Sequence, residues 1–176
     1  MVSGNCGGGE GVLILLWGLP GAGKTTLARA LVGRLGAVHV ESDAVRKRLF
    51  PAPAYTADEH GAVFAKAEAL AREALEAGRH VVFDATNLTR RDRRRFVGLA
   101  RAAGAGLLAV RVTAPEEVLR QRLSRPREGY SDAGVPVLER MQGRVERVEG
   151  RAVVVDSRFP FEPTVTLIAR LVEEMR

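Results

Sequence analysis

The chain of 176 residues is poor in cysteine, aromatic residues and lysine, and it has no long apolar run. Its single cysteine, Cys6, lies in the glycine-rich start and has no partner for an internal disulfide, so we expect a reduced cytoplasmic setting. The longest apolar run, Val12 to Trp17, has six residues, which is far too short to cross a membrane. No basic segment precedes a long apolar region near the N-terminus, so the sequence predicts no secretory signal.

Aromatic residues make up 5% of the chain, which disfavours a long platform for stacking nucleic-acid bases. Lysine is also scarce, because only three of the 27 basic residues are lysine while the net charge is +6. The planar guanidinium group binds phosphate with two parallel hydrogen bonds, so the arginine excess favours phosphate-bearing ligands. A compositional bias that spreads arginine over solvated surfaces explains the excess equally well, and composition alone leaves both interpretations open.

Short apolar runs alternate with amphipathic stretches after a glycine-rich tail at residues 1–10. The apolar runs predict five strands, over residues 12–17, 37–40, 80–84, 106–112 and 152–156. Helical spacing of apolar residues predicts helices over residues 24–35, 43–50, 56–77, 89–103, 115–123, 136–148 and from 163 onward. This alternation is typical of a parallel sheet with helices on both faces, so we expect one α/β domain over residues 11–176.

A phosphate-binding motif, GLPGAGKTT, directly follows the first predicted strand. It fits the pattern G-x-x-x-x-G-K-[ST], with a strand before it and a helix after it. Its glycines let backbone N–H groups turn toward phosphate oxygens, and the helix N-terminus adds partial positive charge. We expect Lys24 to reach the β- and γ-phosphates of a nucleoside triphosphate and the Thr25 hydroxyl to bind Mg²⁺. The predicted nucleotide site comprises Gly18, Leu19, Pro20, Gly21, Ala22, Gly23, Lys24, Thr25 and Thr26.

Two predicted strands end in an aspartate that lacks a following glutamate. Asp84 is followed by Ala85, and Asp156 is followed by Ser157. Nucleotide-driven motors and switches commonly use such a glutamate to activate water. Hydrolysis as the main activity is therefore disfavoured.

An acid and a base follow the second predicted strand, in the stretch VESDAVRKR. In an open parallel sheet, ligands bind beyond the carboxyl ends of the strands, so Asp43, Asp84 and the phosphate loop should share one rim. There Asp43 would accept the proton of an attacking hydroxyl group. Arg46, one helical turn on, would hold an anionic group of the acceptor. A helix N-cap is the alternative role for Asp43, and an exposed helical arginine is the alternative for Arg46.

The stretches GLPGAGKTT, SDAVR and DATNLTRRDRRR together resemble the P-loop kinases of the polynucleotide-kinase, zeta-toxin and gluconate-kinase group, often filed as AAA-type ATP-binding proteins. The resemblance runs from Val12 to Asp156, and it is closest to the 5′-hydroxyl polynucleotide kinases. It implies a three-layer P-loop NTPase fold, a five-stranded parallel sheet of order 2-3-1-4-5 and an arginine-bearing lid. It also implies ATP or another nucleoside triphosphate, Mg²⁺, Asp43 as the general base and Arg46 as the clamp on the acceptor's phosphate.

The same resemblance places the DATN stretch beside the acceptor. Asp84, Thr86 and Asn87 would lie there, and Asp84 would also reach the metal through water. The alternative is a turn in which Asn87 or Thr89 caps the next helix.

The resemblance also implies a lid over residues 120–134. Arg122, Arg125 and Arg127 would contact the triphosphate there and neutralise charge on its γ-phosphate, with Arg125 as the first choice. The alternative is a solvated helix end.

Five arginines between positions 90 and 95 would suit a nucleic-acid backbone, although helical spacing lets only some of them face one ligand. A short oligonucleotide end or a small phosphorylated metabolite fits them better than a long tract. The sequence thus predicts transfer of the γ-phosphate of ATP to a hydroxyl, preferably the 5′-hydroxyl of a nucleic acid or nucleotide. The alternatives are a small-molecule kinase for a sugar, nucleotide sugar or antibiotic, and a nucleotide-binding switch that phosphorylates nothing.

Overall fold

A computed structural model describes residues 11–125, 129–147 and 150–175. The predicted tail with Cys6, and the lid arginine Arg127, lie outside these residues. No helix within the described ranges is long and apolar enough to cross a membrane. In chain order the elements are β1 (Val12–Trp17), α1 (Lys24–Leu35), β2 (Val38–Glu41), α2 (Ser42–Leu49), α3 (Ala57–Glu76), β3 (Val81–Asp84), α4 (Arg90–Ala102), β4 (Gly106–Thr113), α5 (Glu116–Leu123), α6 (Val135–Gln142), β5 (Val153–Asp156) and α7 (Glu162–Glu174).

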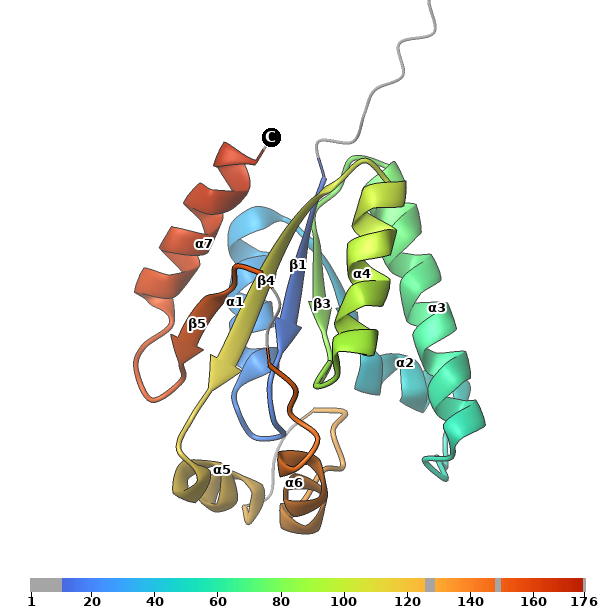
Figure 1. Cartoon of the computed structure of the whole chain (residues 1–176), viewed down its shortest axis with the longest axis vertical. Coiled ribbons are helices and arrows are strands. Elements are labelled where there is room, and N and C mark those ends of the chain that lie inside the picture. Colours follow the sequence, from blue (N-terminus) through green and yellow to red (C-terminus); the bar gives the residue numbers. More distant parts are fainter. Residues whose placement is uncertain (1–10, 126–128, 148–149, 176) are drawn as a thin grey trace, which may run out of the picture.

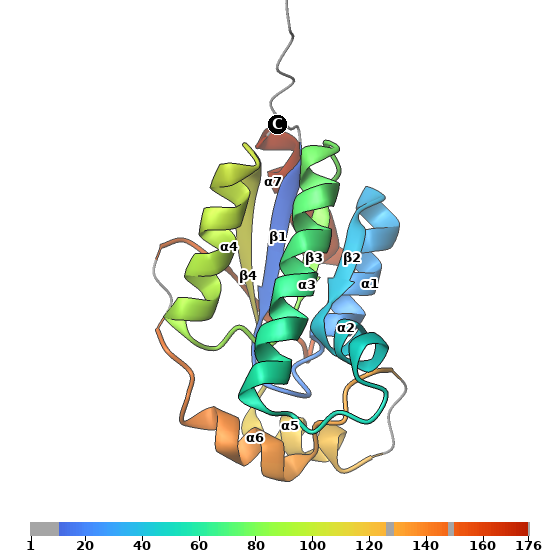
Figure 2. The ribbon, with the colours of Figure 1, turned by 90° about the vertical axis from the view of Figure 1, so that its right-hand side faces the viewer.

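The five strands form one parallel sheet in the order β2-β3-β1-β4-β5. This confirms the predicted strand order 2-3-1-4-5. Figures 1 and 2 show α1 and α7 on one face of the sheet and α3 and α4 on the other. The three layers leave the carboxyl ends of the strands as the rim where the phosphate loop and the DATN loop emerge.

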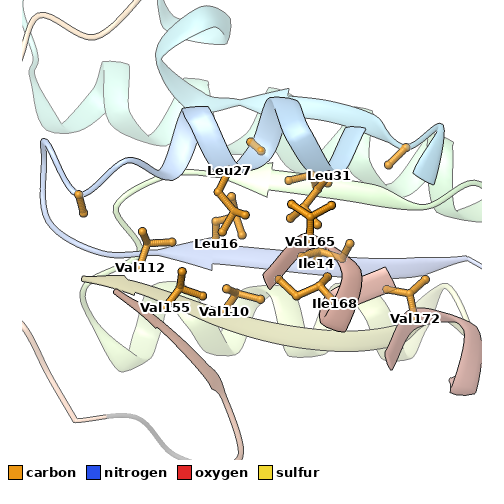
Figure 3. Packing of buried hydrophobic residues seen from close by; sticks show 14 of the residues in the cluster. Ile14, Leu16, Leu27, Leu31, Val110, Val112, Val155, Val165, Ile168 and Val172 are labelled. Atoms are coloured by element: carbon orange, nitrogen blue, oxygen red, sulfur yellow. The ribbon is translucent and has the colours of Figure 1, made fainter. Parts of the chain in front are cut away.

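The central strand β1 is buried on both faces, because successive side chains of a strand point to opposite sides. Ile14 and Leu16 enter the core shared with α1 and α7, where Figure 3 shows them near Leu27 and Ile168. The intervening Leu15 enters the second core, with residues of α3 and α4. Every residue of β1 is at most 1% exposed, so the strand holds the start of the phosphate loop in a fixed position.

The helix predicted over residues 136–148 is wrong at its end, because α6 ends at Gln142. Beyond it, the backbone N–H of Glu146 donates to the Leu88 carbonyl at 3.0 Å. The Arg93 guanidinium group donates to the Glu146 carbonyl at 3.1 Å. These bonds tie the segment after α6 to the loop after β3, and they replace the backbone bonds that a longer helix would have made.

Candidate active site

The phosphate loop connects β1 to α1, and three of its positions require the backbone freedom or the small size of glycine. Gly18, Gly21 and Gly23 have positive φ angles of 149°, 77° and 92°, which side chains rarely adopt. At Gly18 a Cβ atom would also lie 2.2 Å from the Val112 carbonyl oxygen, so no other residue fits there. Gly23 is the N-cap of α1 and supplies no side-chain hydrogen bond to the first turn. The first N–H groups of α1 are therefore left for an anion.

The Lys24 side chain folds back over this loop. Its Nζ atom donates to the carbonyl oxygens of Gly18 at 3.0 Å and Leu19 at 3.1 Å. Charged phosphate oxygens are stronger acceptors than neutral carbonyls, so a triphosphate in the loop would compete for the same ammonium group. The geometry fits the predicted role of Lys24 at the phosphates.

Thr25 and Asp84 meet at the rim although they are far apart in sequence. The Thr25 Oγ1 atom donates to the Asp84 Oδ2 atom at 2.7 Å, and Asp84 is only 3% exposed. A hydroxyl and a carboxylate are the hard oxygen ligands that Mg²⁺ prefers, so this pair fits the predicted metal. No cluster of three or more His, Cys, Asp or Glu residues in the described ranges is placed to hold a metal.

Asp43 is the second residue of α2, and Glu41 occupies the N-cap position. The N-cap alternative for Asp43 is therefore wrong. Burial raises the pKa of the partly buried Asp43 carboxyl group, while a hydrogen bond from Ser131 and the charge of Lys24 act in the opposite direction. The Asp43 carboxyl group therefore lies close enough to the phosphate loop to interact with the charge of Lys24.

Arg46 is buried, with 7% of its surface exposed, so the exposed-arginine alternative is wrong. Its Nε and Nη1 atoms have no hydrogen-bond partner within the described residues. The nearest carboxylate oxygen, Oε2 of Glu59, lies 3.8 Å from Nη1, beyond hydrogen-bonding distance, and the Tyr55 ring centre lies 5.1 Å from the guanidinium carbon. Buried N–H groups without acceptors are costly, so an anionic ligand group at Arg46 would stabilise this arrangement.

The DATN loop binds the start of the phosphate loop. The Gly18 N–H donates to the Thr86 carbonyl at 3.1 Å, and the Asn87 amide donates to the Leu16 carbonyl at 3.1 Å. Asn87 is 1% exposed and has a positive φ of 44°, and Thr89 caps α4 with its side chain. Asn87 and Thr89 thus have the roles expected of a turn and a cap. Of Thr86 and Asn87, only Thr86 is partly exposed at the rim.

The lid arginines differ in what they contact. Arg122 donates through Nη1 to the Gly21 carbonyl at 3.1 Å and to the Ser157 hydroxyl at 2.7 Å. This places its guanidinium group on the phosphate loop. Arg125 lies two residues beyond the end of α5 and is exposed. Geometry therefore favours Arg122 over Arg125, the first choice from the sequence.

A contact that the sequence analysis missed joins the end of the predicted lid to the loop after α2. The Tyr55 hydroxyl donates to the Asp132 Oδ2 atom at 2.7 Å, and the Lys47 ammonium group binds the same oxygen. Burial, followed by the hydrogen bond with Asp132, raises the pKa of Tyr55 to about 12. Tyr55 is 77 residues from Asp132, and neither lies in a motif that would have pointed to the contact.

The arginine run at the start of α4 is partly internal. Arg93 is 8% exposed and donates to the carbonyls of Asn87 and Leu88 at 2.9 and 2.7 Å. Arg95 is paired with the Glu68 carboxylate at 2.6 Å. These arginines do not form one continuous surface for a nucleic-acid backbone.

A glycine-built phosphate loop, followed by a Thr25–Asp84 pair at the carboxyl rim of a sheet of this order, defines a P-loop nucleotide-binding protein of the kinase-like type. The family model described as an AAA domain matches residues 13–148, and the chain belongs to that family. The match agrees with the resemblance to P-loop kinases found in the motifs. No curated protein sequence matches the chain.

Solved structures share the fold over nearly the whole chain. Kti12 from Chaetomium thermophilum, in complex with ADP-AlF3, has a TM-score of 0.74 and 20% identity and covers 93% of this chain and 98% of its own. The Mycobacterium tuberculosis APS kinase CysC, in complex with AMPPNP and APS, has a TM-score of 0.72 and 15% identity, with coverages of 94% and 99%. A gluconokinase from Sinorhizobium meliloti has a TM-score of 0.63 and 26% identity, with coverages of 92% and 93%.

Proposed function

We propose that this protein is an ATP- and Mg²⁺-dependent kinase that transfers the γ-phosphate to a hydroxyl of an acceptor carrying an anionic group. The observation that carries the proposal is the arrangement on α2. There a partly buried Asp43 with a raised pKa lies one helical turn from the buried Arg46. The Nε and Nη1 atoms of Arg46 have no hydrogen-bond partner among the described residues. The first suits a general base, and the second suits an anion clamp.

The other site residues fit the donor side of the reaction. The N–H groups of the phosphate loop and Lys24 would bind the β- and γ-phosphates, and Arg122 would add positive charge beside Gly21. Thr25 and Asp84 would hold Mg²⁺, which neutralises charge on the phosphate oxygens when bound. Asp43 would take the proton of the acceptor hydroxyl while the hydroxyl oxygen forms a bond to the γ-phosphorus. The bond between the γ-phosphorus and the bridging oxygen would break, and ADP would leave with its electrons.

A small phosphorylated acceptor is the preferred class. Arg93 is internal and Arg95 is paired, which removes a continuous basic track for a long nucleic acid. Two of the structural neighbours, the APS kinase and the gluconokinase, are named for small-molecule acceptors, which favours the same class here. The second candidate is the 5′-hydroxyl of a short nucleic-acid end, which the SDAVR and DATN motifs favour.

Phosphate transfer from labelled ATP to a panel of acceptors tests the proposal. The panel contains a nucleoside 3′-phosphate, a short oligonucleotide with a 5′-hydroxyl, a sugar phosphate and the dephosphorylated form of each small acceptor. We expect transfer to at least one phosphorylated acceptor in preference to its dephosphorylated form. Binding of Mg-ATP without transfer to any hydroxyl compound would instead support the nucleotide-binding switch.

Replacing Arg46 should weaken the binding of a phosphorylated acceptor in particular. Arg46→Gln should raise the KM for that acceptor about 10- to 100-fold, because a hydrogen bond to a charged group contributes about 1.5–3 kcal/mol. The KM for the dephosphorylated analogue should change much less. Arg48→Gln, at an exposed position of the same helix, is the matched control. An equal rise for both acceptors would exclude Arg46 as the phosphate clamp.

A further inference from the structure

A cavity of about 120 Å³ lies behind the phosphate loop, between the ends of β1 and β4 and α5. Figure 1 shows α5 and α6 close to these strand ends. The walls are largely apolar and include Leu19, Leu88, Leu119 and Val145. Neither Asp43 nor Arg46 nor Lys24 lines the cavity, so it is separate from the proposed acceptor site.

A guanidinium group and an indole ring border this apolar space. Trp17 contributes to the cavity wall and is 1% exposed. Its Nε1 atom is enclosed by protein and has no hydrogen-bond partner in the part of the chain that the structure describes, so a ligand in the cavity would contact the ring and not this atom. Arg111 also lines the cavity, and its guanidinium carbon lies 5.1 Å from the Trp17 ring centre. A guanidinium group can only donate, so the ligand group that pairs with it must be an acceptor.

The neighbouring polar groups are already engaged. Arg93 stacks on the Trp17 ring at 4.6 Å and donates to backbone carbonyls, which fixes the ring in place. The Thr113 hydroxyl, at the end of β4, donates to the Val155 carbonyl at 3.1 Å. None of the ion pairs found within the described ranges includes Arg111. A negative charge in the cavity would therefore meet Arg111 without competition from an acidic side chain.

We propose that this cavity is a binding site for a small organic carboxylate with an apolar body. The carboxylate would accept hydrogen bonds from Arg111 beside the Trp17 ring, and the apolar body would contact the leucine and valine side chains. A water molecule needs about 10–15 Å³ of such volume, so the cavity accommodates roughly ten non-hydrogen atoms. Benzoate is a probe of this size and chemistry.

Trp17 is the only tryptophan of the chain, so intrinsic fluorescence reports on this cavity directly. Titration with benzoate should give a saturable change in Trp17 fluorescence, with a Kd on the order of 1 mM. Benzamide, which has the same shape without the charge, should bind at least about tenfold more weakly. Inorganic phosphate should leave the fluorescence unchanged over the same range. The absence of a saturable change with benzoate, or equal affinities for benzoate and benzamide, would overturn the proposal.

Variants at the two places distinguish benzoate binding in this cavity from binding at the acceptor site. Arg111→Gln should weaken benzoate binding at least about tenfold in ligand-observed NMR. Arg101→Gln, at an exposed position on α4, and Arg46→Gln should leave it unchanged. Ala114→Leu narrows the cavity and should block benzoate, which keeps the test decisive if Arg111→Gln does not fold. Loss of binding in Arg46→Gln, or retention in both cavity variants, would show that benzoate binds elsewhere.

The cavity shares Gly18, Leu19 and Ala22 with the phosphate loop. A carboxylate bound behind this loop would therefore contact the same backbone that receives the triphosphate. If the two ligands influence each other, the effect is reciprocal: the factor by which Mg-ATP changes the Kd for benzoate equals the factor by which benzoate changes the Kd for Mg-ATP.

Discussion

An Asp43→Asn protein should fold and bind Mg-ATP like the wild type while its kcat falls by about 10²–10⁴. The amide keeps the size of the carboxylate and can still accept the hydrogen bond from Ser131, but it cannot take a proton from the acceptor. Asp43 lies within the first turn of α2 and is not its N-cap, so the substitution removes no cap. Single-turnover transfer to an acceptor found in the panel measures the effect.

Stability should change in the opposite direction to activity. Burial raises the pKa of Asp43 in the folded protein, so the folded state favours its protonated form. The stabilising contribution of such a carboxyl group is fully present below the pKa of the unfolded chain and is lost as the pH rises through the pKa of the folded state. At pH 8 the Asp43→Asn protein should therefore melt at the same temperature as the wild type or above it, and this difference should shrink near pH 4. Melting curves at both pH values distinguish a catalytic defect from unfolding.

Asp58→Asn is the matched control, since it removes one negative charge from an exposed position in α3. It should leave kcat within a factor of about two, as expected for a surface substitution away from the site. An Asp43→Asn protein that transfers phosphate within a few-fold of the wild-type rate would contradict the assignment. Asp84 would then be the next candidate for the base.

The alternating apolar runs predicted five strands in one parallel sheet, and the strand order came from the resemblance of the motifs to P-loop kinases. The end of α6 could not be predicted in the same way. Its apolar spacing continues beyond Gln142, but Arg93 and Leu88 bind the backbone at Glu146 and hold it out of the helix. Those partners lie more than fifty residues away along the chain, with a separation of 53 for Arg93. Periodicity within a short window carries no information about them.

In the site, too, the features set by local sequence could be predicted, and those set by contacts between distant residues could not. The phosphate loop is contiguous in sequence, and the rim rule for parallel sheets was enough to bring Asp84 to Thr25. The burial of Arg46 and the contact of Arg122 with Ser157 depend on which side chains meet across the fold. An arginine-rich sequence offers many candidates for such roles, and residue type alone does not distinguish a buried guanidinium group from a solvated one.

The wild-type protein should gain thermal stability from Mg-ATP, and Lys24→Ala should lose most of that gain. At about a hundred times Kd, ligand binding adds about 2.7 kcal/mol to the free energy of unfolding. For a chain of this size the Tm should rise by about 5–11 °C. Lys24 donates to two carbonyls of its own loop, and the Gly18 N–H bond to Thr86 holds the loop without the lysine. Without nucleotide, the variant should therefore melt close to the wild type.

The loss in Lys24→Ala should extend to catalysis, because the ammonium group would stabilise charge on the transferring phosphate. Removing such a preorganised donor lowers kcat by about 10²–10³. Lys66→Ala, at an exposed position of α3, controls for the loss of one lysine and should keep both the Tm shift and the transfer rate. A full Mg-ATP shift in Lys24→Ala would mean that the nucleotide binds away from the phosphate loop. If Lys24→Ala keeps the full Tm shift but loses transfer, Lys24 acts only in the transition state. Binding of ATP in the ground state would then depend on the N–H groups of the loop and on the Mg²⁺ held by Thr25 and Asp84.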